Sequence, residues 1–188
     1  MQHQIRYLLI IIPEGIIQLK NSKKIILPGV GSFDWAINLL DKSGMRNTLD
    51  KLVLESKIPV LGICVGMQLL ADKGFENGEC IGLGWIEGTV EKFEKNNNNQ
   101  RIPHIGWNEV NFEKETSIFA GVESGEDFYF VHSYHFVCKN STHIIGTTPY
   151  CGEFVSAVKK NNIYGVQFHP EKSQEPGFSL LRNFLSIA

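Results

Sequence analysis

Residues 58–72, IPVLGICVGMQLLAD, contain the change of pattern that decides the fold. The first six of these residues form an apolar run that favours a buried strand, whereas residues 65–72 favour a helix. Gly62, Cys64 and Gly66 make a G-x-C-x-G pattern across the junction. A side chain at such a turn projects from the carboxyl edge of a sheet, so Cys64 is a candidate nucleophile.

Cys64 has two interpretations at this point. Backbone N–H groups at the start of a helix stabilise an oxyanion and favour a thiolate over a thiol. Gly62 and Gly66 fit that interpretation, because a crowded turn leaves no room for Cβ atoms. Cysteine is also among the most buried residue types, and a buried thiol beside a sheet often only packs. This stretch alone leaves both interpretations open.

The residues before this stretch alternate between strand and helix patterns. Apolar runs at 7–12 and 23–27 predict buried strands. Residues 33–44 predict a helix capped by Ser32, and residues 46–57 predict a second helix. This alternation predicts an α/β fold with a mostly parallel central sheet and helices on both faces.

The second half of the chain has a different rhythm. Short strand patterns separated by turn signals predict an antiparallel extension, and they lie at 84–93, 128–138, 143–150, 154–160 and 163–168. An amphipathic helix is predicted at 177–188, and the polar tract at 96–100 is interpreted as a loop tip. We therefore expect one domain over residues 1–188.

Composition limits the classes of function. A net charge of −2 provides no field to attract nucleic acid or an anionic membrane. The longest apolar run, at 7–12, is too short to span a bilayer and lacks a cleavage site after it, which predicts a cytoplasmic protein. The cysteines show no C-x-x-C pairing, so we expect reduced thiols with neither a metal site nor a disulfide scaffold. No role is assigned to Cys80, Cys138 or Cys151.

A thiolate nucleophile needs a base and a group that orients the base. Residues 164–173, YGVQFHPEKS, supply both within three positions. His169 follows an apolar strand that is expected to end at the same sheet edge as Cys64. Glu171 is placed to hydrogen-bond the imidazole nitrogen that faces away from the sulfur. A lone His at a strand end is more often a satisfied surface or core residue, but the His-Pro-Glu turn favours catalysis.

A glycine-rich loop follows the predicted strand at 23–27. Residues 27–33 read LPGVGSF, and Gly29 and Gly31 allow the backbone to approach a ligand closely. Taken alone, this stretch is equally typical of an ordinary connection between a strand and a helix. No Gly-Lys-Ser/Thr sequence follows, so a nucleotide-binding loop is excluded.

These three stretches, in this order, resemble the class I (triad) glutamine amidotransferases. IPHIGWNEV at 102–110 and YFVHSYHF at 129–136 narrow the resemblance to the glutaminase subunits of imidazole glycerol phosphate synthase. The resemblance extends from about residue 13 to the end of the chain.

The resemblance implies roles for individual residues. Cys64 would attack the side-chain amide of glutamine, His169 would pass a proton to the departing ammonia, and Glu171 would orient His169. The positions implied to form the oxyanion hole or to hold glutamine are Gly29, Val30, Gly31, Val65, Gln68, His132, Ser133 and Tyr134. The positions implied to face a partner protein are Trp107, Asn108 and Lys172. Residue types alone leave simpler interpretations open: a polar helix flank for Gln68, a satisfied His in the 132–134 strand, and a core position for Trp107.

The resemblance also implies a partner and no cofactor. Free ammonia is protonated in neutral water and lost as a nucleophile, so a glutaminase of this kind should dock on a synthase and deliver ammonia through a dry passage. In the family that acceptor is a (β/α)8-barrel cyclase subunit, which forms a heterodimer and makes imidazole glycerol phosphate and AICAR.

The N-terminus departs from the family pattern. The usual Asp-Tyr-Gly-x-Gly-Asn turn is absent, and the glycine loop comes too early by about one βα unit of roughly 20 residues. We therefore expect an N-terminal βα unit to be missing, with the strand at 7–12 standing in for one strand.

Three alternatives remain. The same glutaminase chemistry could supply a sugar amidotransferase for surface polysaccharide, since 134–138 departs from the family pattern. The chain could be a catalytically inert docking subunit. A cysteine peptidase or γ-glutamyl hydrolase acting alone is the least favoured.

Overall fold

The computed structural model describes residues 19–94, 100–112 and 116–187. The predicted strand at 7–12 and most of the predicted loop tip at 96–100 lie outside the described residues. The expectation that an N-terminal βα unit is missing concerns the same undescribed part of the chain.

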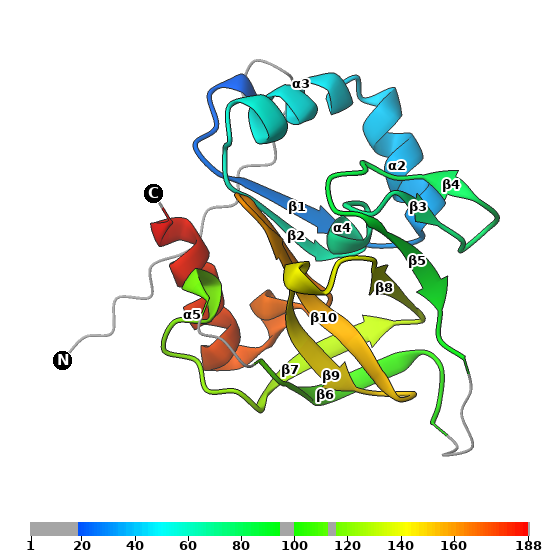
Figure 1. Ribbon diagram of the computed structural model, residues 1–188, viewed down its shortest axis with the longest axis vertical. Helices are drawn as coiled ribbons and strands as arrows, with labels where there is room; N and C mark the ends of the chain where they lie inside the picture. Colours follow the sequence, from blue (N-terminus) through cyan, green and yellow to red (C-terminus); the bar gives the residue numbers. More distant parts are fainter. Residues whose placement is uncertain (1–18, 95–99, 113–115, 188) are drawn as a thin grey trace.

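Three parallel strands form the part of the main sheet that positions the site. The strands β1 (Ile25–Gly29), β2 (Val60–Cys64) and β11 (Ile163–Val166) are neighbours in that order. The register aligns Gly29 with Cys64 and Val166 with Ile63. The carboxyl ends of all three strands therefore meet at one edge, and Figure 1 shows β1 and β2 side by side there.

The remaining strands make the sheet mixed. Its order continues from β11 through strands whose bounds are β10 (Glu153–Lys160), β8 (Tyr134–Cys138), β5 (Gly88–Lys92), β3 (Lys73–Gly74) and β4 (Cys80–Ile81), with β9 (Ile144–Pro149) paired to β10. Among the described strands, these further pairings are antiparallel except for β3 with β5. The predicted α/β class is confirmed, and the antiparallel part is larger than the sequence pattern suggests.

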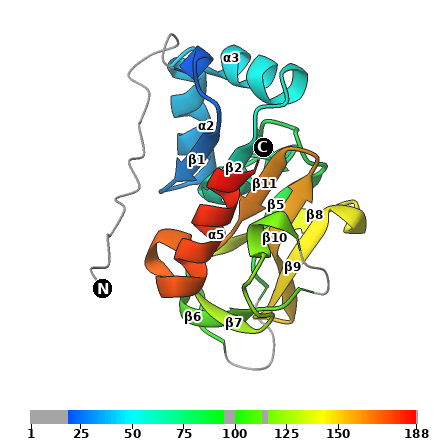
Figure 2. The same ribbon diagram turned by 90° about the vertical axis from the view of Figure 1, so that its left-hand side faces the viewer.

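The two remaining described strands form a second, smaller sheet. It pairs β6 (His104–Val110) with β7 (Glu126–His132) in antiparallel register. Both strands lie at the end of the molecule opposite α3 (Figure 2). Phe128 of β7 packs on Phe168, just beyond β11, with ring centroids 4.2 Å apart. This contact joins the small sheet to the parallel strands.

The helices lie at the predicted segments, but their bounds and caps differ from the prediction. The bounds are α2 (Phe33–Lys42), α3 (Arg46–Asp50), α4 (Val65–Gln68) and α5 (Gln174–Ser186), with a π-helical turn at Lys51–Glu55 and 3-10 turns at Ser117–Phe119, Ser141–His143 and Pro170–Lys172. Ser32 precedes α2 but makes no side-chain cap; instead the Phe33 N–H donates to Glu76 Oε2 at 2.8 Å.

The prediction of a helix over 65–72 is wrong beyond Gln68. The carbonyl groups of Leu69, Leu70 and Ala71 accept hydrogen bonds from backbone N–H groups of residues 83–86. The Leu70 and Ala71 N–H groups donate three positions back, to Met67 and Gln68, and the Asp72 N–H donates to the Gly88 carbonyl, so the i to i−4 ladder stops after one turn.

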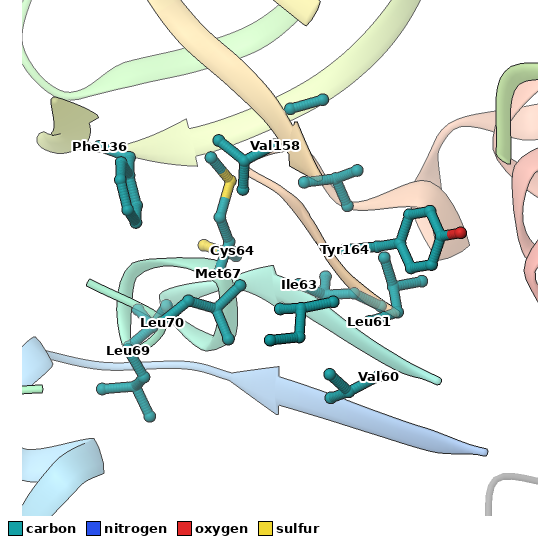
Figure 3. Packing of buried hydrophobic residues seen from close by; sticks show 14 of the residues in the cluster. Val60, Leu61, Ile63, Cys64, Met67, Leu69, Leu70, Phe136, Val158 and Tyr164 are labelled. Carbon is teal, nitrogen blue, oxygen red and sulfur yellow. The ribbon is translucent and has the colours of Figure 1, made fainter. Parts of the chain in front are cut away.

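Helices cover both faces of β11. Successive side chains of a strand point to opposite faces. On one face, Gly165 lies directly beneath Met67 and Leu70, which belong to α4 and the turn after it. On the other, the ring of Tyr164 packs against Phe184 of α5 at 6.1 Å. In Figure 3 Tyr164 points away from Met67 and Leu70.

A groove of about 420 Å³ lies along β1 and α2, and its walls are mostly apolar. Its lining includes Ile26, Trp35 and Leu39.

None of the helices in the described part of the chain is long and apolar enough to cross a membrane.

Candidate active site

Cys64 sits in a strained turn between β2 and α4. Its φ and ψ angles are 54° and −115°, a backbone conformation that residues other than glycine rarely adopt. A Cβ atom at Gly66 would overlap the carbonyl oxygen of Leu27, and one at Gly62 would come within 2.6 Å of the Gly66 oxygen. The two glycines of the pattern are therefore required by close backbone packing, and the predicted turn is present.

The glycine loop after β1 packs directly on the start of α4. A Cβ atom at Gly29 would overlap the backbone nitrogen of Gly66 and lie 2.7 Å from the Val65 Cβ. Val30, next in the loop, is 71% exposed. The loop and the first N–H groups of α4 therefore share one edge of the sheet beside Cys64.

His169 and Glu171 are held together by a tight turn. Pro170–Lys172 forms a 3-10 turn, and Nδ1 of His169 lies 2.8 Å from Oε1 of Glu171. The backbone of Tyr129 on β7 anchors the turn from both sides: its carbonyl accepts from the His169 N–H, and its N–H donates to Ser173 Oγ at 3.0 Å. The buried Ser173 hydroxyl also donates to the His169 carbonyl at 2.6 Å.

The electrostatics of this turn favour an imidazolium. Burial by itself would lower the pKa of His169, but its interactions with Cys64 and Glu171 outweigh burial and raise the pKa to about 9. Burial likewise opposes ionisation of Glu171, but the hydrogen bond and charge of His169 outweigh it and lower the pKa of that carboxyl. Nε2 of His169 is shielded from solvent and has no hydrogen-bond partner among the described residues.

One pocket of about 260 Å³ collects most of the residues predicted for the site. These residues line its wall: Gly29, Val30, Gly31, Cys64, Val65, Gln68, His132, Ser133, Tyr134, His169 and Lys172. Glu171 stands behind His169 rather than in the wall. The structure therefore brings Cys64 and His169, which are 105 positions apart in the chain, to the same cavity.

Two buried side-chain amides, those of Gln68 and Gln167, connect the Tyr134 carbonyl to the Cys64 sulfur. Nε2 of Gln68 donates to the Tyr134 carbonyl at 2.9 Å and to Oε1 of Gln167 at 3.1 Å. Nε2 of Gln167 in turn donates to the Cys64 sulfur at 3.7 Å. Gln167 was not among the predicted site residues, although a polar residue inside an otherwise apolar strand pattern was an available signal.

Glu76 is a second residue of this site that was not predicted from the sequence. It lines the pocket, and its backbone carbonyl accepts from the Tyr134 hydroxyl at 3.2 Å. It lies in an irregular segment between β3 and β4, where local sequence patterns carry little information.

Of the residues predicted to face a partner, Lys172 lines the pocket, whereas Trp107 and Asn108 lie on β6 and do not line it. Trp107 is 46% exposed, so it is not a core residue. The β6–β7 register pairs Trp107 with Tyr129 and Ile105 with Val131 across one face. Lys172 lies over the ring of Tyr129 at 5.7 Å. Asn108 points inward, and its amide donates to the Pro149 carbonyl at 3.2 Å.

Solved structures share this fold. A crystal structure of a glutamine amidotransferase superposes with a TM-score of 0.69 and 22% identity, covering 91% of this chain and 82% of that one. A glutamine amidotransferase from Thermotoga maritima gives a TM-score of 0.60 and 17% identity, covering 86% of this chain and 75% of that one.

Proteins found by sequence comparison share a higher percentage of identical residues with this chain than these solved structures do. The chain is 49% identical to the imidazole glycerol phosphate synthase subunit HisH of Leptospira borgpetersenii, over 90% of this chain and 84% of that protein. It is 45% identical to the HisH subunit of Pelagibacter ubique, over 90% and 82%. The family model for class-I glutamine amidotransferases matches residues 6–188. The chain therefore belongs to the class-I glutamine amidotransferases, and within them to the family of HisH subunits.

Proposed function

We propose that this protein hydrolyses glutamine to glutamate and ammonia, with Cys64 as nucleophile, His169 as acid and base, and Glu171 as the group that orients His169. One observation carries the proposal: Cys64 and His169, from distant parts of the chain, line one pocket, and Glu171 holds the far nitrogen of the imidazole. The strained turn at Cys64 supports it, because such strain concentrates at functional sites.

The reaction has two halves. The Cys64 thiolate adds to the side-chain carbonyl carbon of glutamine, and the oxygen becomes an oxyanion facing the Val65 N–H and the Gly29–Gly31 loop. The protonated Nε2 of His169 donates its proton to the departing nitrogen, which releases ammonia and leaves a γ-glutamyl thioester. His169 then takes a proton from water, which attacks the thioester carbonyl and frees glutamate and the thiolate.

The chemistry of the pocket wall suits glutamine. Gln68, Ser133 and Tyr134 supply polar groups around the amino-acid end of the substrate, and His132 lines the same wall with both ring nitrogens engaged by His104 and Tyr134. The carboxyl group of Glu76 provides a negative charge that complements the substrate's ammonium group. These assignments concern a pocket of about 260 Å³, which is enough for one small polar molecule.

The ammonia is proposed to pass to a cyclase subunit with a (β/α)8 barrel, in a heterodimer that makes imidazole glycerol phosphate and AICAR in the cytoplasm. The names of the HisH relatives support a synthase partner. The exposed face formed by Ile105, Trp107 and Val131 adjoins the pocket through Val131, and Lys172 lies at its edge. Exposed aromatic and aliphatic side chains beside a polar pocket are typical of an interface.

Trapping of the nucleophile tests the proposal. A diazo-ketone analogue of glutamine should label Cys64, as found by peptide mapping, and the label should be lost in His169→Ala. Cys80, Cys138 and Cys151 serve as internal controls in the same digest, because none of them lines the pocket. Label on another cysteine, or none on Cys64 in the complex with the cyclase and its ligand, would refute the assignment and favour an inert docking subunit.

A further inference from the structure

A chain of buried and partly buried hydrogen bonds runs from strand β6 to the nucleophile. Nε2 of His104 lies 3.3 Å from the Asn108 amide nitrogen, and Nδ1 of His104 lies 3.1 Å from Nε2 of His132. Nδ1 of His132 lies 2.8 Å from the Tyr134 carbonyl oxygen. That oxygen also accepts from Gln68, from which the chain continues through Gln167 to the Cys64 sulfur. The β6–β7 register creates the central link, because it pairs His104 with His132.

The Tyr134 carbonyl fixes the direction of every bond in this chain. A carbonyl oxygen only accepts, so Nδ1 of His132 carries the proton and its Nε2 is an acceptor. Nδ1 of His104 must then donate, which leaves its Nε2 to accept from Asn108. Burial supports neutral rings, because it lowers the pKa of His132 to about 3 and that of His104 to about 4. The same carbonyl turns the Gln68 amide so that a donor from Gln167 faces the sulfur.

Aromatic rings enclose the two imidazoles. His104 stacks on Tyr150 with ring centroids 3.9 Å apart and on Phe130 at 4.7 Å. Phe154 lies 5.2 Å from the His132 ring. His104 is 3% exposed and His132 is 7% exposed, so solvent offers neither ring an easy substitute partner. Packing alone would be served equally well by a phenylalanine at position 104, so the imidazole nitrogens need a further explanation.

We propose that His104 is a positioning residue for the active site: by donating to Nε2 of His132 it keeps the Nδ1–H of that ring on the Tyr134 carbonyl, and this carbonyl orients the Gln68 amide and, through it, the Gln167 amide that faces the Cys64 sulfur. This role rests on the glutaminase function proposed above. His104 does not line the pocket and touches no reacting atom. The chain ends on the inner side of β6, where the Asn108 amide also donates to the Pro149 carbonyl.

Three variants separate positioning from packing. His104→Phe keeps a ring but removes both nitrogens. His104→Asn restores a donor near the place of Nδ1 but removes the ring. Phe154→Leu, the matched control, thins the same aromatic enclosure and leaves every bond of the chain in place. Each is measured as the purified chain for the rate of iodoacetamide alkylation at Cys64, and in complex with the cyclase subunit for kcat and KM with glutamine.

A positioning role predicts a specific pattern. His104→Phe should raise KM for glutamine and slow Cys64 alkylation at pH 7, each by about fivefold, as expected for one lost hydrogen bond. His104→Asn should recover at least half of both effects on a logarithmic scale. Phe154→Leu should lower the melting temperature while leaving both quantities within about twofold of the original chain. Equal behaviour of His104→Phe and Phe154→Leu would overturn the proposal.

A further measurement needs no variant and no activity. Long-range ¹H–¹⁵N spectra of the unaltered chain at pH 7 should show His104 and His132 as neutral rings protonated at Nδ1. A proton on Nε2 of either ring would overturn the proposal, even if His104→Phe fails to fold. If the unaltered complex does not hydrolyse glutamine, the proposed function fails, whereas the tautomers and the alkylation rates still decide the positioning role.

Discussion

His169 is the residue on which the chemistry depends most, and its protonation is set by its neighbours. It is 5% exposed, yet its pKa is raised to about 9 because Cys64 and Glu171 together outweigh burial. A charged imidazole in such a site needs a fixed partner, and the 3-10 turn supplies Glu171 two positions away. The Pro-Glu sequence after His169 therefore has a structural reason as well as a chemical one.

Glu171→Gln should reduce stability at neutral pH but not at high pH. The folded pKa of His169 lies above its ordinary value of 6.5, so the stability it contributes is fully present below pH 6.5 and is lost as the pH rises through about 9. Glu171 remains ionised throughout, because its pKa is lowered. The variant should therefore lose about 1 kcal/mol of unfolding free energy at pH 7, a figure that allows for the partial exposure of Glu171.

Urea denaturation between pH 7 and pH 10 checks this prediction. The difference between the unaltered chain and Glu171→Gln should narrow above pH 9. Glu175→Gln removes the same charge from an exposed site on α5 and should show no such trend. A constant difference for Glu171→Gln across the whole range would contradict the pKa argument.

At the scale of elements, β6 and β7 have two different faces. Residues with side chains toward the interior, such as His104, Phe128 and Phe130, are buried, whereas Ile105, Trp107 and Val131 are exposed. This alternation is expected of a sheet that is buried on one side. Here part of the outward side, formed by Ile105, Trp107 and Val131, is apolar, which is why that part is proposed as the partner face.

Ile105→Ser and Trp107→Ala should each weaken binding to the cyclase subunit by about tenfold or more, while the free chain keeps its stability. Titration calorimetry with the purified cyclase measures the affinity. Ile81→Ser is the matched control, because Ile81 on β4 is 58% exposed and Ile105 is 60% exposed. Equal affinities of Ile105→Ser, Trp107→Ala and the control would place the interface elsewhere.

At the scale of the whole molecule, the active site depends on how the two sheets meet. Phe168 is fully buried and lies between β11 and His169 in the chain. Its ring packs against Phe128 and, at 5.7 Å, against Phe130. The backbone bond from His169 to Tyr129 adds a second connection between the sheets. The position of the imidazole is therefore set by this joint as well as by its own strand.

Phe168→Leu should lower both stability and activity, whereas Phe184→Leu should lower stability alone. Both rings are fully buried, so each change should cost about 1–3 kcal/mol of unfolding free energy. Phe184 packs in α5, away from the pocket, and serves as the matched control. Urea denaturation and kcat/KM with glutamine in the cyclase complex test the pair. Equal activities at equal loss of stability would show that the joint does not position His169.

Local patterns predicted the elements well where propensity and packing agree. The change from strand to helix at Cys64, the glycine loop, the His-Pro-Glu turn and the α/β class are all present as predicted. These features can be predicted because backbone sterics at glycine and proline act within a few positions. The helical and strand periodicities of apolar residues are equally local. The helix predicted over 65–72 ends at Gln68 because the Asp72 N–H donates to Gly88 instead of to the carbonyl four positions back, and no local pattern predicts that contact.

By itself, the sequence determined which residue types could do chemistry and at which turns they stand. Only the tertiary structure decided that Cys64 and His169 share a pocket, that Trp107 lies outside the core, and that His104 meets His132. The physical reason is strand register. Contacts between side chains of neighbouring strands depend on how segments far apart in the chain align, and a shift of one residue would turn each side chain to the opposite face.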